Sequence, residues 1–352
     1  MRVHVTDAKP GDCLKTDTYN ANGVPVMVKG TVLAHDDISK LIQHHIDYID
    51  IEPGQQVDAG EFGPDHPASP ELLRPLIPLF DNALEGIENL FLEAAASSRI
   101  NDQQVDEMLT PLISELGNQK DVVSLLLMLD GGDEYTYNHS LQVGVLSYYL
   151  SKWLGHTDQE AYVAGKAGYL HDIGKCMISK AILNKPSKLT EDEFREMKKH
   201  TQYGYELIKN ATGDELSATI ALQHHERESG SGYPYGLTKD EIHPFSKIVA
   251  VADVYSAMTS HRVYQSKQEL LSVLRELYEM SFGELNGEAT QAFIRHMLPN
   301  FINKRVLLNS GQTGTIVLNN PIDYFRPLVK LDTNEFVDLS VKRQLAIEEV
   351  YL

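Results

Sequence analysis

Residues 160–175 read EAYVAGKAGYLHDIGK, and residues 215–226 read ELSATIALQHHE. Both stretches have apolar residues at helical spacing, and both end in side chains that can bind metals. Gly174 suits the end of the first helix, because glycine readily adopts the backbone conformation that closes a helix. The two stretches therefore predict helices that carry histidine and aspartate at their ends.

Three more stretches have apolar residues at helical spacing. They are YTYNHSLQVGVLSYYLSKWL (135–154), TEDEFREMKKHTQYGYELI (190–208) and SKIVAVADVYSAMTS (246–260). Thr190 and Glu193 have the spacing of a capping box, which favours a helix start there. The five helices together carry seven candidate metal ligands, which are His139, His171, Asp172, His200, His224, His225 and Asp253.

Imidazole and carboxylate together suit first-row transition metals, and a carboxylate can bridge two ions. Two ions about 3.5–4 Å apart can activate a shared water and stabilise both oxygens of a phosphoryl displacement. An aspartate buried among imidazoles would be costly as an isolated charge, so a bound cation accounts for it. This set of residues therefore predicts a transition-metal centre of a kind that can promote phosphoryl displacement.

The order of these motifs resembles a known family. His139, HDIGK (171–175), HHE (224–226) and Asp253 are similar to the HD superfamily of metal-dependent phosphohydrolases. The segment HHERESGSGYPYGL (224–237) resembles the HD-GYP subgroup, and KIVAVADVYSAMTSHRVY (247–264) is similar to its following helix. The resemblance covers residues 133–264, about a third of the chain.

This resemblance implies two transition-metal ions, iron or manganese, with Asp172 bridging them. His139, His171, Asp172 and Asp253 would hold one ion, and Asp172, His200, His224 and His225 the other. Some family members hold a third metal through a glutamate, but that position here is Tyr135. We therefore expect two ions.

The resemblance also assigns catalytic and substrate-binding roles. Asp172 and Lys175 would be catalytic, and a metal-bridging hydroxide would attack phosphorus. Lys175 would contact a substrate phosphate, and Arg262 a phosphate or a guanine edge. The Gly232-Tyr233-Pro234 loop would contact the ligand.

The implied activity is hydrolysis of cyclic di-GMP to pGpG, with further hydrolysis to GMP left open. A cyclic GMP-AMP phosphodiesterase is the nearest alternative, and the Gly-Tyr-Pro loop argues against a mononucleotide substrate. A receptor that binds without cleaving is the alternative from another class. Ser256 and Gln265 depart from the residues common in the family, which leaves that alternative open, whereas Lys175 argues against it.

Turn residues divide the chain into four predicted parts. We expect a small β-rich domain at residues 1–60, a helical connector at 61–125, an HD-GYP helical domain at 126–300 and a β-rich segment at 301–352. The fold class is therefore mainly α, with one helix also expected near residues 36–45. The connector helices could pair two chains into a homodimer, although core packing accounts for them equally well.

Composition limits the partners and the compartment. The formal charge of −19 argues against broad binding of long nucleic acids, which requires a positive face. Two cysteines without a CxxC pair fit the reducing cytoplasm. No apolar run is long enough to span a bilayer, and no signal-peptide core opens the chain. Residues 131–135 nearly spell the GGDEF signature of diguanylate cyclases, but they lead directly into a helix, which argues against cyclase activity.

Overall fold

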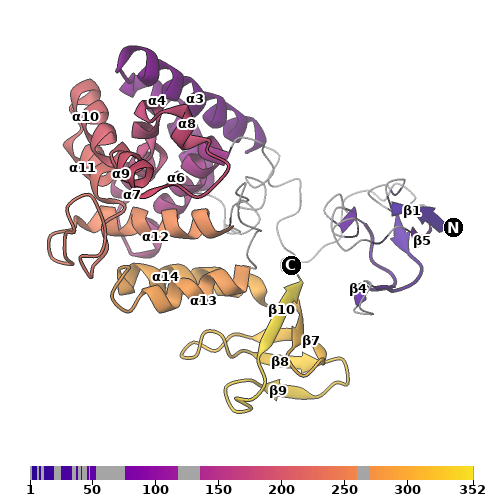
Figure 1. Cartoon of the computed structure of the whole chain (residues 1–352). Helices are drawn as coiled ribbons and strands as arrows, with labels where there is room; N and C mark the ends of the chain where they lie inside the picture. The colour runs from indigo at the N-terminus through magenta and orange to yellow at the C-terminus, as the bar shows by residue number, and fades with distance from the viewer. Residues whose placement is uncertain are drawn as a thin grey trace.

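Helices form the middle of the chain in the computed structural model, and small antiparallel sheets precede and follow them (Figure 1). This arrangement confirms the mainly α fold class. None of the helices in the described part of the chain is long and apolar enough to cross a membrane. The structure describes residues 2–5, 8, 12–19, 25–33, 37–38, 41, 46, 48–52, 76–117, 135–259 and 270–351.

The helices of the body follow one another along the chain, and the long connection from α11 to α12 carries the Gly-Tyr-Pro loop. The α-helices are α3 (Ile77–Ser97), α4 (Asp102–Leu116), α6 (Tyr135–Trp153), α7 (Asp158–Leu170), α8 (Lys180–Leu183), α9 (Glu191–Lys198), α10 (His200–Thr212), α11 (Glu215–Gln223), α12 (Pro244–Thr259), α13 (Leu270–Met280) and α14 (Gly287–Met297). Two 3-10 helices are η2 (Ile173–Met177) and η3 (Leu298–Phe301).

Side-chain caps fix where several of these helices begin. Thr190 and Glu193 form the predicted capping box at the start of α9. The expectation for Gly174 is wrong, because α7 ends at Leu170 and Gly174 lies within η2. Glycine is needed at position 174 because the backbone there approaches α10 closely. A Cβ on Gly174 would lie 2.0 Å from the backbone oxygen of His200.

The helical body has α6 at its centre. Every residue from His139 to Ser151 is buried, and α6 packs against α3, α7 and α12. A helix buried on all sides holds its side chains in fixed positions, which suits a site that needs precise placement.

The predicted connector shares the core of this body. Ile87 and Leu90 of α3, and Leu112 of α4, are fully buried in the same cluster as the side chains of α6 and α7. The Tyr169 hydroxyl of α7 donates a hydrogen bond of 2.6 Å to the backbone oxygen of Ala83 in α3. Core packing thus accounts for the apolar faces of α3 and α4. The predicted domain boundaries stay predictions.

A buried lysine connects α7 to α4. The Lys166 ammonium lies 2.8 Å from the Asp102 carboxylate and 2.7 Å from that of Asp106. Burial opposes its charge, but the two carboxylates raise the pKa of Lys166. We expect Lys166→Met to lower the free energy of unfolding by about 1–3 kcal/mol, because it leaves two carboxylates without their cation while water still reaches them.

Chemical denaturation at two pH values measures this effect. Burial works to raise the pKa of Asp106, but Lys166 and Tyr162 lower it overall. Its contribution is therefore present above its usual pKa and lost as pH falls through the lowered one. The difference between wild type and Lys166→Met should shrink in acid. Lys209→Met breaks an exposed pair and serves as the control; an equal loss in both variants would contradict the prediction.

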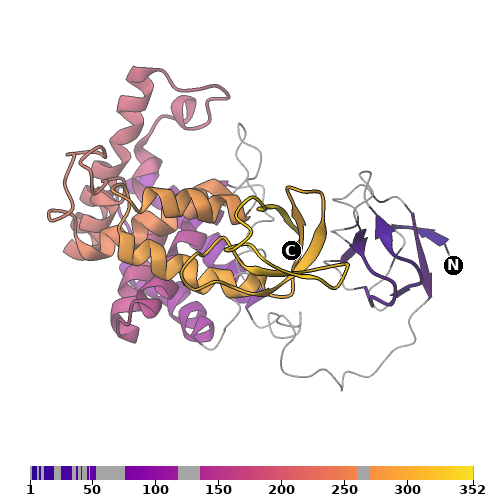
Figure 2. The same ribbon diagram turned by 90° about the horizontal axis from the view of Figure 1, so that it is seen from below.

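The C-terminal sheet continues the core of the helical body. Its strands are β6 (Arg305–Leu308), β7 (Thr313–Leu318), β8 (Leu328–Leu331), β9 (Phe336–Asp338) and β10 (Ile347–Tyr351), in the antiparallel order β10-β6-β7-β8-β9. Val306 and Val329 are fully buried in the same core cluster. Both views place the sheet beside α13 and α14 (Figures 1 and 2), and Arg275 of α13 donates to the Ile347 backbone oxygen at 3.4 Å.

The N-terminal strands have an apolar cluster of their own. The strands are β1 (Arg2–His4), β2 (Cys13–Leu14), β3 (Thr18–Tyr19), β4 (Pro25–Met27) and β5 (Tyr48–Glu52). The strand β5 pairs antiparallel with both β1 and β2. Leu14, Leu33 and the β5 residue Ile51 are buried in one apolar cluster. Asp37, Ile38 and Leu41 are helical, as predicted for residues 36–45; the rest of that prediction lies largely outside the described residues.

Candidate metal centre

The seven candidate ligands come together inside the helical body. One lies in α6, two in the turn between α7 and η2, one at the start of α10, two at the end of α11 and one in α12. In that order they are His139, His171 and Asp172, His200, His224 and His225, and Asp253. Six are buried, and 20% of the His225 side chain is accessible. Five separate helical segments therefore converge on one point.

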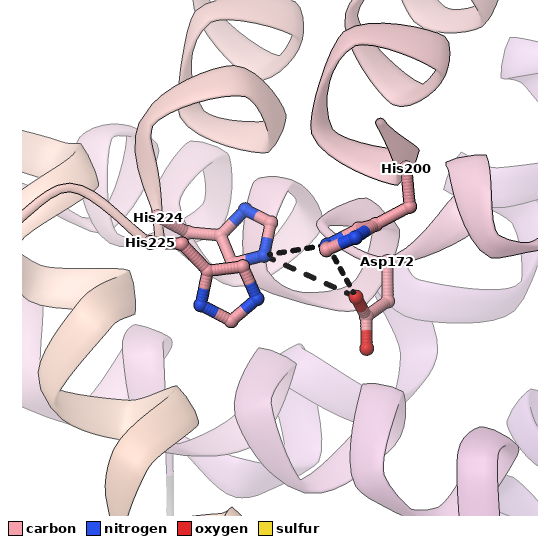
Figure 3. A group of neighbouring side chains, drawn as sticks. All are labelled: Asp172, His200, His224 and His225. Carbon is pink, nitrogen blue, oxygen red and sulfur yellow. Dashed lines mark hydrogen bonds and ion pairs between the residues drawn. The ribbon is translucent and has the colours of Figure 1, made fainter. Parts of the chain in front are cut away.

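The seven residues form two groups. The first group is His139, His171 and Asp253, and the second is Asp172, His200, His224 and His225. Within each group, one ligand atom per residue lies within 4.8 Å of the others. Figure 3 shows the second group, in which Nε2 of His200 lies 3.3 Å from Oδ1 of Asp172 and 3.4 Å from Nε2 of His224. In the first group, His139 Nε2 lies 3.1 Å from Asp253 Oδ1.

Asp172 lies between the two groups. Its Oδ1 faces the second group, at 3.3 Å from His200 Nε2. Its Oδ2 faces the first group, at 3.3 Å from His171 Nε2 and 3.7 Å from His139 Nε2. One carboxylate thus presents one oxygen to each group, which is the geometry that a bridging ligand needs.

Backbone carbonyls set the orientation of three imidazole rings. His171 Nδ1 lies 2.6 Å from the Gly168 oxygen, and His200 and His224 each place Nδ1 2.8 Å from the carbonyl three residues earlier. A carbonyl oxygen can only accept, so each Nδ1 must carry the hydrogen. In the neutral ring, Nε2 then offers a lone pair toward the centre, as a metal ligand requires.

A serine sets the orientation of His139. The Ser256 hydroxyl donates to Gln142 Oε1 at 2.8 Å, and His139 Nδ1 lies 2.9 Å from the same Ser256 oxygen. Because the only hydrogen of that hydroxyl goes to Gln142, its oxygen accepts from His139 Nδ1–H. Ser256 therefore turns Nε2 of His139 toward Asp253 and Asp172. This role went unrecognised in the sequence.

Burial keeps several of these imidazoles neutral. It lowers the pKa of His200 to about 4. Burial and the neighbouring imidazoles lower the pKa of His224 and His225 well below the usual range. For Asp172, burial works in the opposite direction, but Lys175 and His171 hold its pKa well below the usual range. Neutral imidazoles beside an ionised carboxylate are the protonation states that bind metal.

The lone pairs of His200 and His224 at the centre face one another without a hydrogen between them. Nε2 of His200 and Nε2 of His224 are both acceptors in the orientation that the carbonyls impose, and both face Asp172 Oδ1. His171 Nε2 and Asp172 Oδ1 are buried and have no hydrogen-bond partner among the described residues. Buried acceptors that converge in this way repel one another unless a cation lies between them. The residues therefore fit a divalent metal ion.

The proposed catalytic lysine lies beside the bridging position. The Lys175 ammonium donates to Asp172 Oδ2, and 19% of the Lys175 side chain is accessible. Its position in η2, three residues after Asp172, brings it to the same carboxylate that faces both groups. Lys175 is therefore the cation nearest this carboxylate among the described ion pairs of the site.

The Gly-Tyr-Pro loop lies against the second group. The Tyr233 ring lies 4.6 Å from the His225 ring, with an interplanar angle of 32°. The backbone N–H of Tyr233 donates to the His225 oxygen at 3.2 Å. A Cβ on Gly232 would lie 2.5 Å from that same oxygen and from the Arg227 nitrogen, so only glycine fits there. Pro234 follows in the loop.

The Glu226 carboxylate anchors this loop through two hydrogen bonds to its backbone. Its side chain is 2% exposed, and it accepts hydrogen bonds from the backbone N–H groups of Tyr235 at 2.8 Å and Leu237 at 2.9 Å. Sequence reasoning noted Glu226 within the HHE motif but gave it no role. A carboxylate directly before a glycine-rich loop was the available signal, since loop N–H groups that are removed from water need acceptors.

Some predicted residues cannot be placed. Arg262 and Gln265 lie outside the described residues, as do residues 131–134 and the side chain of Tyr135. The predicted contact of Arg262 with a phosphate or a guanine, and the argument about a third metal, therefore stay predictions.

This convergence of histidines and aspartates on a helical body defines the class of the chain. Residues 128–283 match the family described as HD domain. The HHE and Gly-Tyr-Pro segments within this range are similar to the HD-GYP type of that domain, in line with the prediction from the sequence.

Known proteins support this assignment. The chain is 31% identical over 254 residues to the cyclic di-GMP phosphodiesterase PA4108 of Pseudomonas aeruginosa, which covers 72% of this chain and 61% of that protein. It is 31% identical over 194 residues to the 3′3′-cGAMP-specific phosphodiesterase 1 of Vibrio cholerae, covering 53% of this chain and 44% of that one. The chain thus spans less than two thirds of the length of these relatives.

The fold is also similar to a solved structure. That structure is Bd1817, described as an HDG"Y"P protein from Bdellovibrio bacteriovorus. The TM-score is 0.51 at 14% identity, and the match covers 83% of this chain and 97% of that one. At this identity the likeness shows the fold alone.

Proposed function

We propose that this chain is a metal-dependent phosphodiesterase that hydrolyses cyclic di-GMP to pGpG, with further hydrolysis to GMP as a second stage. One observation carries the proposal: Asp172 presents one oxygen to each of two groups of buried histidine lone pairs. The similarity to a cyclic di-GMP phosphodiesterase over 72% of the chain supports the choice of substrate.

The proposed cofactors are two ions of iron or manganese. The first group of ligands, with Asp172, would hold one ion, and the second group would hold the other. When bound, such ions activate water and neutralise the charge of phosphate oxygens. The mixed set suits these metals, because imidazole is a good ligand for iron and carboxylate is a good ligand for manganese.

The remaining roles belong to side chains around this centre. Asp172 supplies negative charge to both ions, and Lys175 balances it. With Asp172 bound to metal, the Lys175 ammonium can bind a substrate phosphate oxygen instead. Tyr233 would contact the bound nucleotide, a role supported by the position of its ring beside His225 of the second group. Hydrolysis adds water across one phosphodiester bond and frees a 3′ hydroxyl.

A comparison of substrates tests this proposal. Metal-loaded protein is given equal concentrations of cyclic di-GMP and cyclic GMP-AMP, and the products are separated by chromatography. We expect pGpG to form faster than the linear product of cyclic GMP-AMP. A faster reaction with cyclic GMP-AMP would favour the alternative suggested by the Vibrio cholerae relative. Binding of either dinucleotide without cleavage would favour a receptor.

The Ser256 hydroxyl should strengthen metal binding through His139. We expect Ser256→Ala to weaken metal affinity about 10- to 100-fold, because His139 loses the acceptor that orients its ring. Calorimetric titration of metal-stripped protein with Mn²⁺ measures the affinity. Ser147→Ala is a matched control. The Ser147 hydroxyl is buried on α6, the helix that carries His139, and it has no hydrogen-bond partner among the described residues. Equal affinities in both variants would refute the role of Ser256.

The oligomeric state and compartment stay predictions. Within the described part of residues 61–125, the surface that the shared core leaves exposed includes Leu92, which is 57% exposed and is available to a homodimer contact. Sedimentation of the full chain at micromolar concentration distinguishes a dimer from a monomer. The location in the reducing cytoplasm also stays a prediction.

A further inference from the structure

An aromatic and cationic cluster lies at the edge of the metal centre. It consists of Phe194 and Lys198 of α9 and Tyr233 of the Gly-Tyr-Pro loop. The Lys198 ammonium lies 4.7 Å from the centre of the Phe194 ring and 5.2 Å from that of Tyr233. The two rings are 6.3 Å apart at an interplanar angle of 77°. We call these three residues the α9 rim.

Tyr233 joins the rim to the metal centre. Its ring lies 4.6 Å from the His225 ring and 6.4 Å from the His200 ring, both of the second ligand group. Lys198 is the last residue of α9, and His200 is the first residue of α10. A molecule held by the rim would therefore be adjacent to the second group of candidate ligands.

Lys198 differs from the other cations of α9. Arg195 pairs with Asp192 at 3.1 Å, and Lys199, which follows the helix, pairs with Glu196 at 2.6 Å. Within the described residues, Lys198 has no carboxylate partner and contacts only the two rings by its ammonium. In a chain with a formal charge of −19, a cation that avoids carboxylates beside a phosphodiesterase site is suited to an anionic ligand.

Phe194 presents an uncovered aromatic surface at the same place. Its side chain is 46% exposed, although phenylalanine is usually covered in folded proteins. An exposed ring beside an ammonium is the combination by which proteins bind nucleotides, since every base can stack on a ring and every phosphate attracts a cation. Phe282 and Phe336 are more exposed than Phe194, so the position of Phe194 beside Lys198 and the metal centre, and not its exposure alone, points to a ligand.

We propose that the α9 rim is a nucleotide-binding subsite, in which Phe194 stacks on a base and Lys198 binds a phosphate of the same dinucleotide. This inference rests on the proposed function and deepens it, because it names residues that bind the substrate but are not metal ligands. Phe194 and Lys198 are binding residues and take no part in bond cleavage.

Steady-state kinetics with metal-loaded full-length protein test the rim. We expect Phe194→Ala to raise KM for cyclic di-GMP roughly tenfold and to leave kcat within about twofold, because stacking on one base is lost while the metal centre is intact. Phe194→Trp should restore the KM, whereas Phe194→Leu, which is apolar but not aromatic, should not. Phe282→Ala, which removes a ring that is 72% exposed, is the matched control.

The salt dependence of KM distinguishes the contribution of Lys198 from that of Phe194. We expect Lys198→Met to raise KM roughly tenfold at low ionic strength, and that difference should shrink at about 1 M salt, where screening acts within a few ångströms. The effect of Phe194→Ala should persist at both salt concentrations. Lys198→Arg should keep most of the wild-type affinity. Metal content measured for each variant should equal that of wild type.

A direct measurement of cyclic di-GMP binding tests the α9 rim independently of the proposed phosphodiesterase activity. If wild type cleaves the dinucleotide and both variants keep the wild-type KM and binding affinity, the rim is overturned and the phosphodiesterase proposal stands. If wild type binds without cleaving, the phosphodiesterase proposal fails, and weaker binding by the variants still supports the rim. If wild type does not bind at all, both are overturned.

Discussion

Asp172→Asn should lower the turnover of cyclic di-GMP by about 10³-fold, because it removes the charge that faces both ligand groups. The substitution keeps the size of the side chain, so the fold should survive. Its amide nitrogen would replace one of the two oxygens, which lie 3.3 Å from His171 Nε2 and 3.3 Å from His200 Nε2. We expect the bound metal per chain to fall together with the activity.

Metal analysis of the purified variant, beside a turnover assay, measures this effect. Asp158→Asn is the matched control, since its carboxylate is 89% exposed at the start of α7 and pairs only with Lys152 among the described residues. The control should keep both activity and metal content. Full metal content and near wild-type turnover in Asp172→Asn would show that the bridging role is wrong.

Gly174→Ala should have the second largest effect, although Gly174 binds nothing. The added Cβ would lie 2.0 Å from the His200 oxygen and 2.4 Å from the Gly204 nitrogen, and both are backbone atoms of α10. Backbone cannot rotate away as a side chain can, so α10 must shift from η2. We expect a loss of about 3 kcal/mol in the free energy of unfolding, or more.

The same shift should affect the metal centre. His200 begins α10, and Asp172 directly precedes η2, so moving one helix from the other separates two residues of the second ligand group. Thermal unfolding and Mn²⁺ titration measure the two consequences. Gly287→Ala is the control, because its Cβ would have only an ordinary contact of 3.5 Å. Unchanged stability and metal affinity in Gly174→Ala would contradict the prediction.

The sequence was sufficient to find the helices that carry the site. Apolar spacing depends on local geometry, so the stretches around His139 and Asp253 could be assigned to helices without knowledge of their neighbours. The stretch 190–208 was predicted as one helix, but the structure divides it at Lys199 into α9 and α10. Caps such as Thr190 with Glu193 involve residues three apart, and the structure confirms that box. The ordered motifs also led to the HD-GYP family.

The parts that sequence reasoning missed depend on contacts between distant segments. Ser256 meets His139 across 117 positions. Gly174 was interpreted as a helix end because its close approach to α10 depends on how η2 and α10 pack. Phe194 and Lys198 look like members of a solvated helix face until the loop with Tyr233 is placed beside them.

One strand at the end of the chain was also not predicted individually. Within the β-rich segment predicted at 301–352, the stretches RVLLNS (305–310), GTIVLNN (314–320), RPLVKLD (326–332) and EFVDLSV (335–341) read as strands, and they correspond to β6, β7, β8 and β9. The fifth, β10, reads IEEVY, in which two adjacent glutamates break the alternation of apolar and polar residues. Its pairing with β6 includes an irregular register between Ile347 and Glu349, which accounts for the broken pattern.

The most direct test of the central claim is turnover of cyclic di-GMP by one protein sample before chelation, after chelation and after reloading with Mn²⁺ or Fe²⁺. We predict that the metal-loaded sample yields pGpG, the stripped sample yields none, and reloading restores the original rate with two ions per chain. A reloaded protein that holds two ions and leaves the dinucleotide uncleaved would contradict the account.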